Sequence, residues 1–268
     1  MTLFGFKMAF ETISIQRDEN VGVIKLNRPE VKNALNRQMV EELLTALGEL
    51  EQDSEIRVIV ITGNGSSFCT GRDLGDARKI GKEDVIGRRS AYQRMARLMV
   101  KISEIPKPVI AAVHGYALAG GCGLAASCDL VVASEDAVFG IPEVKIGLTP
   151  GTVTAPLFRS IGRKKATEML LTGETLDANE GYRIGLVNKV VSKEKLMDLT
   201  LQLAKKIAGN SPVAIKIWKE AVHAQYDADY ARLMNHFAEI VTLSSLTADA
   251  SEGSEAFFGK RKPKWQGH

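Results

Sequence analysis

Apolar and polar residues alternate in short blocks through the first half of the chain. Around the turn signal RDENVG, the segments FETISIQ and VGVIKLN place apolar side chains at alternate or consecutive positions, which predicts a β-hairpin over residues 10–27. Residues 37–53 (RQMVEELLTALGELEQD) repeat apolar residues at helical spacing, and residues 57–63 (RVIVITG) are a β-branched run that ends at Gly63. The predicted order is therefore strand, strand, helix, strand.

The same rhythm continues to residue 134. A polar loop (63–76) precedes a charged helical stretch at about 83–104, and KPVIAAVHG (107–115) is again typical of a buried strand. A glycine-rich segment then leads into a short helix before CDLVVAS (128–134), which predicts a further strand. Strands that alternate with helices favour an α/β fold with a mainly parallel sheet and helices on its faces.

The second half of the chain has a helical pattern. From Gly162 onward, helices are predicted for RKKATEMLLTG, DANEGYRIG, SKEKLMDLTLQLAKKIAG, SPVAIKIWKEAVHAQ and DADYARLMNHFAEIVTLSSL, with the short run LVNKVV between them. We therefore predict an α/β core domain over residues 1–200 and a helical C-terminal region over residues 201–268. The helical region is a candidate assembly surface.

Composition narrows the function classes. A chain of 268 residues, 45% hydrophobic and 25% charged, can bury a full core, and its net charge of +3 comes mostly from GKRKPKW near the C-terminus. Charge alone therefore does not indicate nucleic-acid binding. The three cysteines lack the spacing of a metal site or of a disulfide framework, which favours a reducing compartment. Without an apolar run of ~18 residues there is no predicted membrane span, so we expect a cytoplasmic protein.

Two glycine-rich loops follow neighbouring strands: GNGSSFCTGRDL (63–74) and HGYALAGGCGL (114–124). Consecutive parallel strands end on one side of the sheet, so both loops can meet at one edge. Three interpretations remain open: turns without chemistry, a dinucleotide site based on the GxGxxA match at 121–126, or an oxyanion hole made of two backbone amides. Seven residues separate Val113 from Gly121, which disfavours the dinucleotide site and an NAD-dependent oxidoreductase.

A family resemblance covers almost the whole chain. The segment HGYALAGGCGLAASCDLVVASEDAVFGIPEVKIGLTP resembles the signature of the crotonase superfamily, the enoyl-CoA hydratases and isomerases. NRPEVKNALN, ITGNGSSFCTGRDL, EMLLTGETLDANEGYRIGLVNKVV and EGSEAFFGKRKPKW follow the family order. The resemblance implies a crotonase-like ββα spiral core and an acyl-CoA thioester substrate, with no permanently bound cofactor and no metal.

The resemblance also assigns binding positions. The amides of Arg72 and Gly120 would hold the thioester oxygen and stabilise an enolate, each such donor being worth ~10²- to 10³-fold in rate. Coenzyme A would lie along Val31, Lys32, Ala34, Thr70, Asp73 and Leu74, and Phe257 and Lys260 match tail positions that reach adenine and phosphate, often those of a neighbouring subunit. The resemblance and the helical C-terminal region together imply a homotrimer or a dimer of trimers.

The catalytic positions depart from the family's hydratases. Hydratases of the family hold water between two glutamates, of which the second matches Glu143 and the first matches Gly123. A single acid fits isomerisation of a 3-enoyl thioester, in which Glu143 takes a proton from C2 and returns it to C4. Burial in an acyl pocket would raise the pKa of Glu143. A helix N-terminal role after Pro142 is the structural alternative.

Other departures leave the reaction open. Where hydratases commonly carry a PGAGGTQ-type segment, this chain has PGTVTAPLF, so Val153 and Thr154 replace small residues and would narrow the pocket. We interpret Cys122 as core filling and His114 as a structural hydrogen-bonding residue. A second catalytic group from the variable region would keep hydration possible; the candidates are Asp76, Arg78, Glu83, Asp84 and Tyr92. A non-catalytic CoA-ester-binding homologue is the remaining alternative, and the acyl group is not specified.

Overall fold

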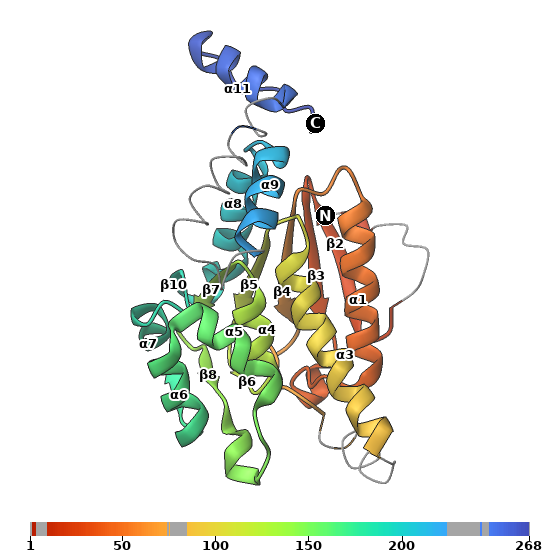
Figure 1. Cartoon of the computed structure of the whole chain (residues 1–268), viewed down its shortest axis with the longest axis vertical. Helices are drawn as coiled ribbons and strands as arrows, with labels where there is room; N and C mark the ends of the chain where they lie inside the picture. The colour runs from red at the N-terminus through yellow and green to blue at the C-terminus, as the bar shows by residue number, and fades with distance from the viewer. Residues whose placement is uncertain are drawn as a thin grey trace.

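A seven-stranded sheet forms the centre of the protein in the computed structural model, which describes residues 2–3, 10–73, 75, 85–223, 242 and 247–267 (Figure 1). In spatial order its strands are β1 (Thr2–Leu3), β2 (Ile13–Asp18), β3 (Val21–Leu26), β4 (Val58–Gly63), β5 (Val109–Val113), β7 (Leu130–Ser134) and β10 (Lys189–Val191).

The strand pairing confirms the predicted hairpin and the predicted parallel sheet. β2 and β3 pair antiparallel with Ile13 opposite Leu26, whereas β3, β4, β5, β7 and β10 run parallel to one another. β10 is formed by the last three residues of the run LVNKVV and lies at the edge of the main sheet beside β7, although a helical stretch precedes it. β4 and β5 are therefore neighbours whose carboxyl ends point the same way.

Helices cover both faces of this sheet. They are η1 (Pro29–Val31), α1 (Arg37–Gln52), α3 (Val85–Glu104), α4 (Gly120–Ser127), η2 (Pro142–Ile146), α5 (Gly151–Ile161), α6 (Arg163–Thr172), α7 (Ala178–Arg183), η3 (Lys193–Lys195), α8 (Leu196–Ala208), α9 (Pro212–His223) and α11 (Ala248–Phe258).

Alternate residues of the central strands face two separate cores. Val58 and Val60 of β4 pack with α8, while Ile59 and Ile61 of the same strand pack on the side of α1, α3, α4 and α5. Each side chain of a strand points opposite to its neighbour, so a run of buried residues serves both faces at once. Because both faces of these strands are buried, their sequences are continuous apolar runs without polar–apolar alternation.

A second, three-stranded sheet was missed by the sequence pattern. β6 (Tyr116–Leu118) pairs parallel with β8 (Val138–Gly140), and β8 pairs antiparallel with β9 (Thr175–Asp177). Each strand has three residues, too few to display a period. α5 was missed as well, because Pro150, Gly151 and Pro156 are turn signals that hide the helical spacing of Val153 and Leu157.

The predicted boundary at residue 200 falls inside α8. This helix buries Leu196, Thr200 and Ala204 against the main sheet, whereas α11 extends away from the sheet at the far end of the molecule (Figure 1). The division into two domains stays a prediction. The helix predicted for residues 227–246 lies outside the described residues, apart from Thr242.

Candidate active site

The two glycine-rich loops lie side by side, as the parallel order of β4 and β5 predicts. The amide of Cys69 donates to Tyr116 O (2.9 Å) and the amide of Leu118 donates to Cys69 O (2.9 Å), so the first loop forms a ladder with β6. His114 Nε2 lies 3.1 Å from Gly65 O and is buried, and burial lowers the pKa of His114. The bond agrees with a structural role for this histidine.

A third segment pairs with the first loop. The amide of Leu35 donates to Gly71 O (2.7 Å), and the amide of Asp73 donates to Leu35 O (3.0 Å). In a parallel bridge of this kind the residue between the two bonded positions, Arg72, directs its own N–H to the opposite side. The Arg72 amide therefore faces away from Leu35.

The second loop turns sharply into α4 at Ala119. This residue has φ 50° and ψ −125°, a backbone conformation that residues other than glycine rarely adopt and that costs of order 1–3 kcal/mol. It is held by a bond from its amide to Gly140 O (2.8 Å) and by a bond from the Gly123 amide to its carbonyl (3.1 Å). Gly120 is thus the first residue of α4, where an amide has no acceptor inside its own helix.

The amides of Arg72 and Gly120 lie at the same point of contact between the loops. A methyl group on Gly120 would stand 3.8 Å from the Arg72 nitrogen and 3.5 Å from Gly71 Cα. A methyl on Gly71, which has φ 85°, would stand 2.8 Å from the Gly120 nitrogen. The positive end of the α4 dipole adds to this pair of donors. The geometry suits a single carbonyl oxygen between two amides.

The next two residues of α4 serve packing. A methyl on Gly121 would overlap the carbonyl oxygen of Cys69, so only glycine allows this approach. Cys122 is fully buried, and burial, with a smaller contribution from the charge of Glu143, raises the pKa of its thiol to about 12. A thiol with this pKa is not a nucleophile near neutral pH, which agrees with core filling.

Glu143 lies in η2, three residues after β8. Its Oε2 is buried and has no hydrogen-bond partner among the described residues. Burial raises the pKa of its carboxyl group, and a bond from its own amide partly offsets the shift. The Gly140 carbonyl accepts the Ala119 amide (2.8 Å), so the segment that leads into η2 starts beside the first turn of α4. A buried carboxylate with an unused oxygen and a raised pKa is typical of functional sites.

The predicted CoA positions divide into two groups. Lys32, Ala34, Thr70 and Asp73 come together, since the amide of Thr70 donates to Lys32 O (3.2 Å) beside the Leu35 pairing. Val31 and Lys32 are exposed, and the Lys32 ammonium lies 4.9 Å from the centre of the Tyr116 ring. These residues form one rim of the loops.

The remaining predicted positions are Leu74, Phe257 and Lys260. Leu74 and the side chain of Phe257 lie outside the described residues. Lys260 is exposed just after α11, at the opposite end of the chain's fold from β6 and β8 (Figure 1). Asp76, Arg78, Glu83 and Asp84 also lie outside the described residues, and Tyr92 stacks on the Arg72 guanidinium with its ring centre 4.7 Å away.

Asn33 is a positioning residue that the sequence analysis missed. It is fully buried with φ 56°, its Oδ1 accepts from the Arg28 amide (2.9 Å), and its Nδ2 donates to Asn64 O and Ser67 O (2.9 and 2.8 Å). It fastens the η1 loop to the first glycine loop. The available signal was the residue type, since asparagine tolerates a left-handed backbone better than most residues.

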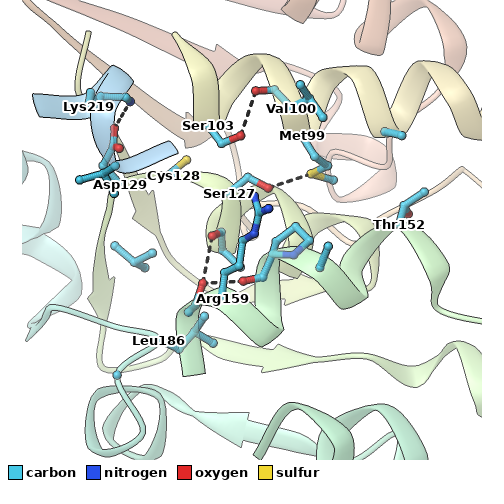
Figure 2. A pocket seen from close by; sticks show the side chains of 18 of the residues that line it. Met99, Val100, Ser103, Ser127, Cys128, Asp129, Thr152, Arg159, Leu186 and Lys219 are labelled. Carbon is cyan, nitrogen blue, oxygen red and sulfur yellow. Dashed lines mark hydrogen bonds and ion pairs between the residues drawn. The ribbon is translucent and has the colours of Figure 1, made fainter. Parts of the chain in front are cut away.

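A cavity lies elsewhere among the described residues, at the C-terminal end of α4. It has a volume of about 510 Å³ and is lined by residues of α3, α4, α5 and α9 (Figure 2). Several polar side chains there are paired: Lys219 with Asp129, Ser127 with Met99, and Ser103 with the Val100 carbonyl. We therefore place the candidate active site at the N-terminal end of α4, where polar groups are unpaired.

The described residues contain no cluster of three or more His, Cys, Asp or Glu side chains arranged to hold a metal ion. None of their helices combines the length and the apolar character needed to cross a bilayer.

The fold and the two amide donors define a class of protein, and comparison with known proteins identifies it. The sequence model of the enoyl-CoA hydratase/isomerase family matches residues 16–268, so the chain belongs to this family and is an enzyme of the enoyl-CoA hydratase type with the crotonase fold. Family membership implies an acyl-CoA thioester as substrate.

Individual relatives agree. The chain is 38% identical to a probable enoyl-CoA hydratase of Mycobacterium bovis over 259 residues, which covers 96% of this chain and 99% of the relative. It is 36% identical to the short-chain-enoyl-CoA hydratase of Clostridium acetobutylicum, with 95% and 97% covered. The crystal structure of an enoyl-CoA hydratase from Mycobacterium smegmatis matches with a TM-score of 0.90 at 35% identity, covering 95% of this chain and 99% of that one.

Proposed function

We propose that this enzyme moves the double bond of a 3-enoyl-CoA into conjugation with the thioester, with Glu143 as its one acid–base group. The observation that carries the proposal is the contrast between two positions near the first turn of α4. Glu143 has a buried carboxylate oxygen without a protein partner, while position 123 is a glycine and offers no second carboxylate. One carboxylate can move a proton between two carbons, but it cannot hold a water molecule between two acids.

The proton and electrons balance within one substrate. Glu143 takes the proton from C2, the C2–H electron pair forms the C1=C2 bond of a dienolate, and the carbonyl pair moves to the thioester oxygen. The amides of Arg72 and Gly120 hold that oxygen as it gains negative charge. The oxygen pair then re-forms the carbonyl, the C1=C2 pair becomes the C2=C3 bond, and the former C3=C4 pair takes the proton from Glu143 at C4.

The raised pKa of Glu143 suits this shuttle. A carboxyl group with a raised pKa is a stronger base toward C2 when it is ionised. The cause of the shift is burial, with no neighbouring carboxylate among its contributors. The same burial keeps bulk water from competing for the dienolate.

The coenzyme A part of the substrate would lie along the rim of Val31, Lys32, Ala34, Thr70 and Asp73. Lys32 is exposed there and supplies a cation for phosphate. Leu74, Phe257 and Lys260 complete the proposed set. Because α11 lies at the far end of the chain, Phe257 and Lys260 would act on the substrate of a neighbouring subunit.

Such sharing requires an oligomer, and we propose a homotrimer or a dimer of trimers. Light scattering on the purified protein should give a mass of three or six times 29.2 kDa. A monomeric mass at micromolar concentration would contradict the assignment of Phe257 and Lys260.

Hydration is the second candidate, and the relatives favour it. The M. bovis and C. acetobutylicum proteins are named as hydratases at 38% and 36% identity. In this chain, hydration would need water held by Glu143 together with a group other than position 123, for which residues 76–92 remain the candidates.

Ultraviolet absorbance separates the two reactions. We expect 3-enoyl-CoA to gain the absorbance of a conjugated thioester when the enzyme is added, and 2-enoyl-CoA to keep its own. A loss of absorbance with 2-enoyl-CoA alone would favour hydration. If neither thioester reacts and Glu143→Gln binds CoA esters as tightly as wild type, the chain is a non-catalytic binding protein and the proposal is wrong.

A further inference from the structure

We infer that Val153 on α5 is a specificity-determining residue: its side chain occupies the space in which a carboxylate at position 123 would have to stand. The inference rests on the proposed single-acid function and deepens it. A glycine at position 123 removes one acid, but the space beside that glycine decides whether another group can take its place.

Gly123 is glycine because of packing and not because of its backbone angles. It lies within α4, is fully buried and does not have a positive φ. A Cβ at this position would stand 2.6 Å from Val153 Cγ1, 3.2 Å from Val153 Cβ and 3.3 Å from Met99 Cε. The first of these contacts is too short for any real pair of carbon atoms.

Val153 cannot easily move away. It is 1% exposed, and a valine in a helix is nearly confined to one χ1 rotamer because its side chain branches at Cβ. Met99, from α3, is different, since its Cε is the end of a flexible side chain that can adapt. The obstacle at position 123 is therefore one γ-methyl group of one residue.

α4 is also fixed from its other sides. Gly121 packs directly against the Cys69 carbonyl, and Ser127 Oγ donates to Met99 Sδ of α3 (3.3 Å). A shift of α4 away from α5 would therefore meet the Cys69 carbonyl or strain the bond to α3. The positions 123 and 153 are consequently coupled, and either can enlarge only if the other shrinks.

The consequence for the reaction is direct. The γ-methyl group of Val153 fills the space beside position 123. It therefore excludes a second acid there, and with it the water molecule that two acids would hold. The acyl group of the substrate then meets an apolar surface that holds no water, which favours proton transfer between C2 and C4 over addition of water.

A stability cycle tests the coupling without any substrate. We expect Gly123→Ala to lower the melting temperature by about 2–12 °C, the range that overpacking a core gives in a chain of this size. Val153→Ala lowers it through a cavity. The double variant G123A/V153A should melt at least about 3 °C above the value that adding the two single effects gives. Additive effects would overturn the inference.

A catalytic test uses the carboxylate itself. G123E should fold poorly or not at all, whereas G123E/V153A should fold and hydrate 2-enoyl-CoA at least about 10-fold faster than its matched control, G123Q/V153A, which has the same size and no acid. If the folded G123E/V153A hydrates no faster than G123Q/V153A, Val153 does not determine the reaction.

The two failures are distinguishable. If wild-type enzyme does not isomerise 3-enoyl-CoA, the proposed function is wrong, yet the stability cycle still reports whether Val153 closes position 123. If wild type isomerises and G123E is as stable as wild type, the proposed function stands and the inference about Val153 is wrong.

Discussion

The two ends of α4 differ in what they leave unpaired. At its N-terminal end, glycines bring the amide of Gly120 beside the amide of Arg72, and neither the strand ladder nor the helix uses these donors. At its C-terminal end lies a cavity of about 510 Å³, where Lys219 is paired with Asp129 and Ser127 with Met99. We propose the N-terminal end as the place of the chemistry because its two amide donors are unpaired.

The two ends also differ in how they are built. The N-terminal end is held by backbone bonds among β6, β8 and the first glycine loop, so its donors are fixed by the ladder and by the strained Ala119. The C-terminal end is held by side chains that satisfy buried charges. Changes at the first end should therefore affect catalysis, and changes at the second should affect stability.

Glu143→Gln gives the largest expected effect. Losing the one acid–base group should lower the rate on 3-enoyl-CoA by about 10²- to 10⁴-fold, while the variant stays folded. The measurement is steady-state absorbance together with thermal melting. Glu194→Gln, on the exposed η3, is the matched control and should leave the rate unchanged. Normal turnover by the Glu143→Gln enzyme would contradict the proposal that the reaction takes place at the N-terminal end of α4.

Gly120→Ala separates the function of that end from its folding. The new methyl would make ordinary contacts with Leu35 and Gly71 but would stand 3.8 Å from the Arg72 nitrogen, over the space between the donors. We expect near-normal stability and a loss of about 10- to 10³-fold in rate, comparable with the loss of one donor.

Two glycine variants provide the comparison for Gly120→Ala. Gly71→Ala should lose stability as well as activity, because Gly71 has φ 85° and touches Ala119. Gly48→Ala, where the methyl meets nothing within 4 Å, should keep activity and gain about 0.5–1 kcal/mol in its helix. Equal activities for Gly120→Ala and Gly48→Ala would contradict the oxyanion assignment.

Lys219→Met tests the other end of α4. Lys219 is 2% exposed and pairs with Asp129, whose side chain is 22% exposed, so removal leaves a mostly buried carboxylate with the Val109 amide as its donor. We expect the free energy of unfolding, measured in urea, to fall by about 3 kcal/mol, the low end for breaking a buried ion pair. We expect kcat to stay unchanged. Lys216→Met on the exposed face of α9 should change the free energy of unfolding by less than about 0.5 kcal/mol.

The smallest effect concerns pH and stability. The folded pKa of Glu143 is raised above 4.5, so the folded state binds more protons than the unfolded state between pH 4.5 and that raised value. The contribution of this residue to the free energy of unfolding therefore falls as the pH rises through this window. Chemical unfolding of wild type and Glu143→Gln should show the variant gaining relative stability across the window and no relative change below it.

The rate has the opposite dependence on pH. Because the base must be ionised to take the C2 proton, kcat should fall as the pH drops below the raised pKa of Glu143. A kcat that stays constant down to pH 4.5 would show that burial does not raise the pKa of Glu143 during the reaction.

The elements that a local sequence pattern specifies were predicted correctly from the sequence. The hairpin of β2 and β3, the helix α1 and the parallel strands β4, β5 and β7 all follow from apolar spacing over five to sixteen residues. The order of β4 and β5, each followed by a glycine loop, also predicted that the loops would meet. Family motifs then supplied Arg72, Gly120 and Glu143 as candidates, and the roles of these residues stay proposals.

What the sequence by itself determined is therefore the family, the alternation of strands and helices, and the absence of an acid at position 123. Only the tertiary structure decided the rest: the small sheet of three-residue strands, the buried Asn33, the strained Ala119 and the contact of Val153 with Gly123. Short-range patterns record what each segment buries, because periodicity reflects one face of one element. Contacts between residues 30 positions apart depend on how several elements pack, and no local pattern along the chain specifies those distances.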